Sequence, residues 1–330
     1  MSTSSELQQT IADMVDDHRG ILAADESLPT ITKRFAGINV EATEENRRAY
    51  RALLLDTPDL GKYIAGVILF EETLAQKDDN QVPLPEVAWS QKIVPGVKVD
   101  KGKGPLPGAP GDLITYGLDG LANRLEGYKK QGARFAKWRE VYPISHHNPT
   151  QMGRHANAEM LARYAAVCQE MGVVPIVEPE VLMDGDHDID RCASVTEHVL
   201  HSVFHALHLH GVSLEHMILK PNMVAARQGL PHRRSPGSGR SHPAHPEACG
   251  TCRRAQHQFS VWRPGTGRSH RQPECHQSAQ GKCAVATEHL LWPGATAARP
   301  SCLAGQAGKQ GESTESTAQA RTPQQPCQAR

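Results

Sequence analysis

The sequence predicts an α/β fold of the (β/α)₈ barrel type, in which residues 1–224 encode only six of the eight strands. Short apolar segments alternate with helical ones there, and each apolar segment carries an ionisable residue at or near its end. Such alternation predicts parallel strands with right-handed crossovers. A barrel collects its chemistry where its strands end. No G-x-G-x-x-G motif follows the first strand, so a doubly wound sheet is less favoured.

The predicted elements begin with an amphipathic helix whose apolar face includes Leu7, Ile11 and Met14, behind Ser4 and Ser5 as capping residues. The strand-like segments are residues 20–27, 65–72, 94–102, 135–140, 173–180 and 216–223. Their charged residues are, in order, Asp25, Glu71, Lys98, Lys137, Glu178 and Lys220. Helical segments such as 41–56 and 158–172 separate them.

Several lysines and carboxylates that converge on one barrel mouth indicate Schiff-base chemistry. A lysine must be neutral to attack a carbonyl, and nearby cations or desolvation lower its pKa. Lys220 is the best candidate nucleophile, because it is a lone lysine at the end of an apolar strand. Lys137 and Lys98 are candidate neighbouring cations, and Glu178 and Asp25 are candidates for the proton transfers. A single lysine at a strand end is more often only a solvated charge.

Nine segments resemble a known family, in its order and spacing. They are "GILAADES", "EENRRAYR", "GVILFEETL", "GVKVDKG", "GLDGL", "FAKWR", "HANAEMLARYA", "VPIVEPEVLMDGDHD" and "LKPNMV". Residues 1–224 thereby resemble class I fructose-bisphosphate aldolase. The resemblance implies a TIM barrel and a glycolytic lyase that needs no metal and no cofactor. It implies reversible cleavage of fructose 1,6-bisphosphate to glycerone phosphate and glyceraldehyde 3-phosphate.

The resemblance also implies roles for individual residues. Lys220 would form the Schiff base, and Glu178 would be the acid/base in carbinolamine dehydration. Asp25 would take the proton from the hydroxyl at the bond that is cleaved. The residues implied to line the substrate site or contact its phosphates are Lys137, Lys98, Arg139, Arg34 and Arg47. The partner would be a sugar phosphate, and the family is typically homo-oligomeric.

Two other clusters are weaker candidates for metal sites. Asp184, Asp186 and Asp188 are spaced like the first calcium ligands of an EF-hand, but Ile189 occupies the position that requires glycine. His201 and His205 have the i, i+4 spacing of a zinc pair. On a polar helix face, solvated histidines are the better interpretation, so no metal is expected.

Residues 225–330 differ in composition from residues 1–224, which predicts a low-complexity basic tail. This segment has 14 Lys and Arg residues against 5 Glu, and it contains no Asp, Ile, Met, Tyr or Asn. So few apolar residues cannot offset the entropy of ordering a chain, and disordered or non-native structure is expected. A zinc site at Cys249 and Cys252, or a basic arm that binds RNA, are two hypotheses for this segment.

A shift of reading frame explains more of the tail than either hypothesis. If the DNA is read one base later, codons permitted for "QFSVWRP" encode NFLSGGQ, and codons permitted for the segment that begins "TEHLLWPG" encode a sequence with SYGR. Both shifted sequences resemble later parts of the same family. Trp262 and Trp292 have a single codon, and each becomes glycine in the shifted frame. The out-of-frame translation would begin at about residue 225.

The frame shift has consequences for activity. A barrel without its last two strands would expose the edges of its first and sixth strands, and we expect little or no activity. The alternative is a non-catalytic aldolase remnant whose basic tail binds RNA or another partner. The primary expectation includes no nucleic acid and no membrane, and it places the protein in the cytoplasm.

Overall fold

The computed structural model describes residues 2–15, 18–226 and 284–285. Most of the predicted tail lies outside these residues, as do both zinc-candidate cysteines and both frame-marking tryptophans. The chain divides into two compact units, and their described parts are residues 2–15, 18–26, 51–226 and 284–285 in the first and Ser27–Tyr50 in the second. The predicted boundary after Val224 stays a prediction.

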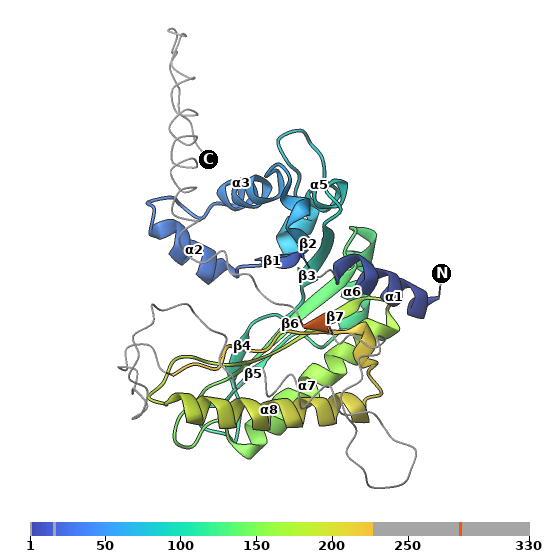
Figure 1. Cartoon of the computed structure of the whole chain (residues 1–330). Helices are drawn as coiled ribbons and strands as arrows, with labels where there is room; N and C mark the ends of the chain where they lie inside the picture. Colours follow the sequence, from blue (N-terminus) through green and yellow to red (C-terminus); the bar gives the residue numbers. More distant parts are fainter. Residues whose placement is uncertain (1, 16–17, 227–283, 286–330) are drawn as a thin grey trace, which may run out of the picture. The chain divides into compact units, whose positions relative to one another are not determined.

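The first unit contains helices and strands in alternation (Figure 1). Its strands are β1 (Gly20–Ala24), β2 (Ile64–Leu69), β3 (Val94–Lys98), β4 (Lys103–Pro105), β5 (Leu113–Thr115), β6 (Phe135–Tyr142), β7 (Val174–Val181), β8 (Ile218–Leu219) and β9 (Ala284–Val285). Its helices are α1 (Thr3–Met14), α4 (Glu71–Ala75), α5 (Leu84–Ser90), α6 (Leu121–Lys130), α7 (Gln151–Glu170), α8 (Ile189–Leu209) and the 3₁₀ turns Leu60–Lys62 and Leu214–His216. The cap of α1 is Ser2, whose side chain accepts a hydrogen bond from the Ser5 amide, so Ser4 and Ser5 are not the caps.

Six parallel strands form a half-barrel, which confirms the predicted fold class. The order is β1-β2-β3-β6-β7-β8, so each barrel strand pairs with the next barrel strand along the chain. β9 extends this sheet, because Ala284 and Val285 pair in parallel with Ile218 and Leu219. The expectation that the sixth strand exposes its edge is therefore wrong at Ile218 and Leu219.

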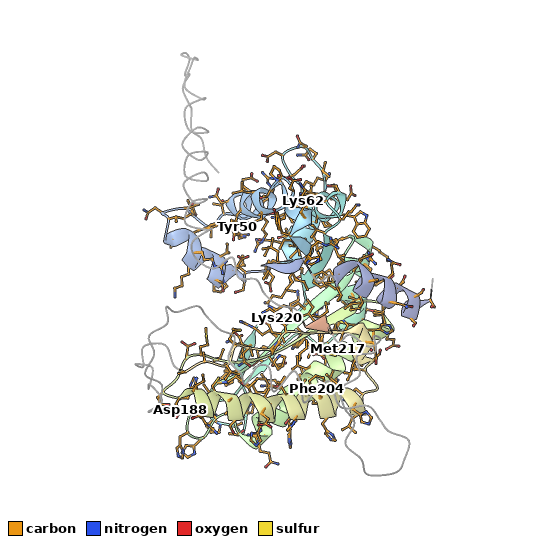
Figure 2. The ribbon with its side chains drawn as sticks, in the orientation of Figure 1. Tyr50, Lys62, Asp188, Phe204, Met217 and Lys220 are labelled. Atoms are coloured by element: carbon orange, nitrogen blue, oxygen red, sulfur yellow. The ribbon has the colours of Figure 1, made fainter. Side chains whose placement is uncertain are left out.

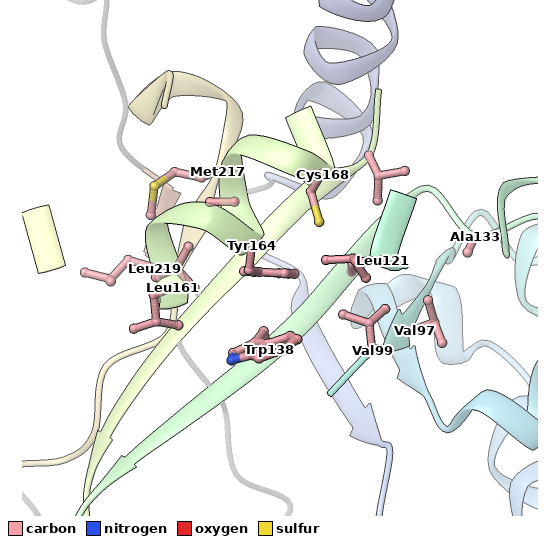
Figure 3. Packing of buried hydrophobic residues seen from close by; sticks show 14 of the residues in the cluster. Val97, Val99, Leu121, Ala133, Trp138, Leu161, Tyr164, Cys168, Met217 and Leu219 are labelled. Atoms are coloured by element: carbon pink, nitrogen blue, oxygen red, sulfur yellow. The ribbon is translucent and has the colours of Figure 1, made fainter. Parts of the chain in front are cut away.

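The alternation of side chains along the strands separates two apolar clusters. On β6, Phe135 belongs to a small cluster with Leu7 and Met14 of α1 and with residues of β2, β3, β7 and β8. Trp138, on the opposite face of β6, belongs to the larger cluster between the sheet and its covering helices. There it stacks on Tyr164 of α7, with ring centroids 5.5 Å apart (Figure 3).

Close packing of the small cluster requires glycine at position 96. A Cβ added to Gly96 on β3 would overlap the ring of Phe135, which is fully buried on the neighbouring strand. Leu7 and Met14 of α1 pack in the same cluster, and α1 contacts β2, β3 and β7. The first helix thus covers the apolar layer on that face of the strands.

The second unit contains α2 (Leu28–Ala36) and the beginning of α3 (Glu44–Leu55), which continues into the first unit. Pro29 stands in the first turn of α2, where its missing N–H is tolerated. Phe35 of α2 meets Tyr50 of α3 edge to face, with ring centroids 5.7 Å apart. This ring contact joins the two helical segments.

Candidate active site

Six of the eight predicted site residues lie on, or directly after, parallel strands of the first unit. Asp25 directly follows β1. Lys220, which is labelled in Figure 2, directly follows β8. Lys98 ends β3, Lys137 and Arg139 lie on β6, and Glu178 lies on β7. The register sets Lys98 opposite Lys137 and Arg139 opposite Glu178. The Lys220 amide also donates to the Val177 carbonyl at 2.9 Å, which continues the ladder.

Four of these side chains form a continuous series of alternating charges. Lys220 Nζ donates to Glu178 Oε1 at 2.5 Å. Glu178 Oε2 lies 2.9 Å from Lys137 Nζ as an ion pair. Lys137 Nζ in turn donates to Asp25 Oδ2 at 2.9 Å. The structure therefore brings together the candidate nucleophile, the candidate acid/base and the two other predicted catalytic residues.

Mutual pairing keeps Asp25 and Lys137 ionised although both are buried. Asp25, Lys137 and Glu178 are each less than 10% exposed. Burial favours the neutral acid at Asp25, but the charge and hydrogen bond of Lys137 outweigh it and hold the pKa of Asp25 below its usual value. Burial likewise favours neutral Lys137, but Asp25 and Glu178 raise its pKa well above the usual value. Lys137 is thus a permanent cation beside Glu178.

Arg139 and Lys98 extend the charged surface, each paired with a carboxylate that the sequence analysis missed. Arg139 Nη1 donates to Glu180 Oε2 at 2.9 Å, and Lys98 Nζ lies 2.8 Å from Asp100 Oδ1. Glu180 is two residues beyond Glu178 on β7, so period-two spacing places both on one face. A second carboxylate two residues after Glu178 is the sequence signal from which Glu180 could have been found. Burial opposes the charge of Arg139, but Glu180 and Glu178 raise its pKa.

Arg51 is a buried cation that holds the end of β1 next to Asp25. Its side chain is fully buried and donates to the carbonyls of Ala24 at 3.1 Å and Glu26 at 3.0 Å. Its Nη1 also pairs with Glu72 at 3.2 Å. The two carbonyls flank Asp25 in the chain, so Arg51 restrains the backbone that carries this carboxylate. Arg51 is one of several arginines on this helix, and their spacing in the sequence does not distinguish it from the others.

Glu140 is a second functional candidate that the sequence analysis missed. It lies on β6 but faces away from the ion-pair series, is fully buried, and accepts from Trp138 Nε1 at 2.8 Å and from the Thr115 amide at 3.1 Å. Burial raises the pKa of Glu140 to about 7, with a further contribution from the charge of Asp100, although the two hydrogen bonds oppose it. No ion pair to Glu140 is found in the part of the chain that the structure describes.

Arg34 and Arg47 lie on α2 and α3 in the second unit, so their predicted phosphate contacts stay predictions. Glu71 ends no strand: it begins α4, accepts from Tyr128 Oη at 2.6 Å and pairs with Lys101. It is therefore separate from the series of four.

The weaker metal candidates have structural roles or remain at the surface. Asp188 caps α8, because its side chain accepts from the Arg191 amide at 2.8 Å. His201 and His205 are exposed on the same helix. Residues 2–15, 18–226 and 284–285 contain no group of three or more His, Cys, Asp or Glu that could hold a metal ion. Within the same ranges, no helix is long and apolar enough to cross a membrane.

Comparison with known proteins gives consistent matches. The family model described as "Glycolytic: Fructose-bisphosphate aldolase class-I" matches residues 6–239, and so extends beyond Val224. A "Probable fructose-bisphosphate aldolase class 1" of Xanthomonas campestris is 54% identical over 230 residues, which is 70% of this chain and 69% of that protein. Human "Fructose-bisphosphate aldolase C" is 52% identical over 232 residues, 70% of this chain and 64% of that protein.

A solved structure shares the fold. It is the fructose-bisphosphate aldolase of Plasmodium falciparum in complex with TRAP and a small-molecule inhibitor. The TM-score is 0.69 at 50% identity, and the match covers 71% of this chain and 68% of that one. The chain thus spans about two thirds of the length of the relatives it matches.

Proposed function

Because the chain belongs to the class I fructose-bisphosphate aldolase family, we propose that Lys220 forms a Schiff base with the carbonyl carbon of a sugar phosphate. The observation that carries this proposal is the short contact between Lys220 Nζ and Glu178 Oε1, 2.5 Å, at the end of the Glu178–Lys137–Asp25 series. A nucleophilic lysine needs a base within hydrogen-bond reach to become neutral, and Glu178 meets that requirement.

The proposed sequence of proton transfers uses the same contacts. Glu178 takes a proton from the Lys220 ammonium, and the neutral amine attacks the substrate carbonyl to form a C–N bond. The carbonyl oxygen takes the electron pair of the C=O π bond and the proton that the nitrogen loses, and becomes the carbinolamine hydroxyl. Glu178 then returns a proton to the carbinolamine hydroxyl, which leaves as water when the C=N bond forms. Lys137 remains an ammonium throughout, and its charge keeps Asp25 ionised. When the C–C bond breaks, Asp25 accepts the proton of the substrate hydroxyl, whose oxygen becomes the carbonyl oxygen of the departing aldehyde. The electron pair of the broken bond passes into the C=N group, which becomes an enamine.

Borohydride trapping tests the imine directly. The full chain is incubated with fructose 1,6-bisphosphate, reduced with sodium borohydride, digested, and analysed by mass spectrometry. We expect one covalent adduct, on Lys220, and no adduct in a Lys220→Met variant. A Lys130→Met variant is the matched control, since Lys130 is an exposed lysine on α6 that pairs with Glu126. An adduct on another lysine, or none in the wild-type chain, contradicts the proposal.

Turnover is proposed to be much weaker than imine formation. Residues 225–330 as written contain neither the NFLSGGQ nor the SYGR segment expected from the resemblance, so the proposed phosphate loops are missing from the sequence. We expect single-turnover trapping but little steady-state cleavage in a coupled assay for glyceraldehyde 3-phosphate. Rapid steady-state turnover by the purified chain would contradict this.

The charge of residues 225–330 favours a second candidate, a remnant that binds RNA through its 14 basic residues. RNA retention that falls with added salt and disappears on deletion of 225–330 would support it. Retention that survives the deletion would exclude it.

A further inference from the structure

The backbone pairing between β7 and β8 stops beside the proposed nucleophile. Strand β8 is only two residues long. In the described part of the chain, the last backbone bond between these strands runs from the Lys220 amide to the Val177 carbonyl. Bonds along one edge of a parallel strand recur at every second residue. The next position on this edge of β7 is Pro179, which has no N–H to donate.

The side chain of Asn222 continues the attachment where the backbone pairing stops. The Val181 amide, two residues beyond Pro179, donates to Asn222 Oδ1 at 3.2 Å. Asn222 Nδ2 donates to Thr196 Oγ1 of α8 at 3.1 Å. A backbone amide can only donate, so Val181 requires the oxygen of the Asn222 carboxamide and leaves its nitrogen for Thr196. This side chain thus connects β7, α8 and the segment that follows β8.

These bonds lie next to the contact on which the proposed chemistry depends. Lys220 is two residues before Asn222, and Glu178 is three residues before Val181. The segments that carry Lys220 and Glu178 are therefore joined on both sides, by the Lys220–Val177 bond and by the Asn222–Val181 bond. A lysine side chain is a long, flexible stem. The 2.5 Å contact between Lys220 Nζ and Glu178 Oε1 therefore depends on where the backbone of Lys220 is held.

We propose that Asn222 is a positioning residue, which holds the backbone of Lys220 so that Nζ stays within reach of Glu178. The inference rests on the proposed function, because it concerns how fast Lys220 becomes neutral and forms the imine. Asn222 itself takes no part in bond formation or proton transfer. Thr196, which is buried on α8, fixes the orientation of the Asn222 carboxamide.

The first experiment measures the rate of imine formation by borohydride trapping of the full chain at saturating fructose 1,6-bisphosphate. A misplacement of about 1 Å can slow a reaction by up to about 10²-fold. We expect Asn222→Ala to slow trapping at Lys220 roughly tenfold, with the half-saturating concentration unchanged. Asn80→Ala is the matched control, since Asn80 is an exposed asparagine whose Nδ2 donates to Asp78 at 3.4 Å. Equal rates for the two variants would overturn the proposal.

A double-mutant cycle separates positioning from a general loss of stability. Glu178→Gln removes the base with which Asn222 aligns Lys220. We therefore expect Asn222→Ala to slow trapping less than about twofold in the Glu178→Gln background, followed over longer incubations. The same loss in both backgrounds would mean that Asn222 only stabilises the fold, and would refute the positioning role.

The contact with α8 allows a conservative variant. Thr196→Val removes the hydroxyl that accepts from Asn222 Nδ2, whereas Thr196→Ser keeps it. We expect trapping at Lys220 to be about threefold slower in Thr196→Val and close to wild type in Thr196→Ser. Equal rates in these two variants would show that Thr196 does not orient Asn222.

Cross-linking measures the contact without any imine. A water-soluble carbodiimide joins a carboxylate to an amine that touches it; an amide bond forms, and the carbodiimide takes up the elements of water and becomes a urea. We expect the Lys220–Glu178 cross-link, quantified by mass spectrometry, to be several-fold weaker in Asn222→Ala than in the wild-type chain. The Lys130–Glu126 cross-link on α6 should be unchanged.

Two outcomes separate this proposal from the proposed function. Equal Lys220–Glu178 yields in Asn222→Ala and the wild-type chain, or no such cross-link in the wild-type chain, would overturn the positioning role. A weaker cross-link in Asn222→Ala, together with no sugar-phosphate adduct on Lys220 in the wild-type chain, would support the positioning of the side chain and refute the Schiff base alone.

Discussion

Burial of the Glu140 carboxyl makes the stability of the fold depend on pH, and Glu140→Gln isolates that dependence. The side chain is fully buried on β6 and is held by two neutral donors, the Trp138 indole and the Thr115 amide. Neither donor compensates the negative charge as a cation would. The ionised form therefore loses more hydration than it recovers, and burial raises the pKa of Glu140 from 4.5 to about 7.

The magnitude follows from linkage between folding and proton binding. The folded state binds the Glu140 proton more tightly than the unfolded state, so the stabilisation is complete below about pH 4.5. It is lost as the pH rises through about 7. The difference between 4.5 and about 7, at ~1.36 kcal/mol per pH unit, gives about 3 kcal/mol in the free energy of unfolding. Roughly 2.5 kcal/mol of this loss falls between pH 5 and pH 8.

The assay is urea unfolding of the wild-type chain and Glu140→Gln at pH 5, 6, 7 and 8. Other titrating groups contribute equally to both proteins, so the difference between the two stability curves reports Glu140 alone. The Gln variant should gain about 2.5 kcal/mol on the wild-type chain between pH 5 and pH 8, whatever their offset at pH 5. Glu170→Gln, at an exposed carboxylate that ends α7, is the control and should run parallel to wild type.

Parallel curves for Glu140→Gln and wild type would refute the reasoning. They would mean that water or an unidentified cation reaches the carboxyl, so that its charge is as well solvated in the fold as in the unfolded chain. A difference of the opposite sign would mean that the hydrogen bonds from Trp138 and Thr115 outweigh the desolvation.

Three further predictions concern single contacts. Lys137→Met leaves Asp25 and Glu178 buried without their shared cation, and should lower the free energy of urea unfolding at pH 8 by about 3–5 kcal/mol. This loss of stability should be smaller at pH 5, where the carboxyls take up protons. An equal loss at pH 5 and pH 8 would contradict the prediction. Arg51→Met removes both donors to the β1 terminus and should cost about 3 kcal/mol, with Arg51→Lys recovering part of it; an unaltered melting temperature would argue against that role. Gly96→Ala should lower stability by about 1–3 kcal/mol because of overlap with Phe135, whereas Gly127→Ala in α6, where an added Cβ meets no neighbour, should be neutral or stabilising.

The fold and the principal site residues could be predicted because their signals are local. Each barrel strand is a short apolar segment, and the charged residue at its end is adjacent to that segment in the sequence. Asp25, Lys98 and Lys220 were found in this way, and the structure places them at strand ends. Glu71 followed the same rule but failed, because the chain turns into α4 at that residue and its carboxylate pairs with Lys101 and Tyr128.

The residues that were missed depend on partners distant in the sequence. Arg51 reads as one of several arginines on an amphipathic helix, and only the position of α3 against the end of β1 makes it a buried donor. Glu140 reads as the polar end of a strand, and only the fold shows that it is buried and accepts a hydrogen bond from Thr115 of β5.

The sequence by itself determined the family, the strand–helix alternation and the identity of the candidate nucleophile, because short-range patterns and motifs suffice for these. Only the tertiary structure decided which charges meet. The four residues of the charged series lie far apart in the sequence, on or directly after four different strands: Asp25 after β1, Lys137 on β6, Glu178 on β7 and Lys220 after β8. Neighbouring contacts in the series are 2.5–2.9 Å long. Register aligns β6, β7 and β8, whereas Asp25 follows β1, which is not paired with β6. Register and crossover packing are properties of the assembled sheet. The desolvation that raises the pKa of Glu140, and the ion pairing that outweighs desolvation at Asp25 and Lys137, exist only once that sheet is assembled and covered.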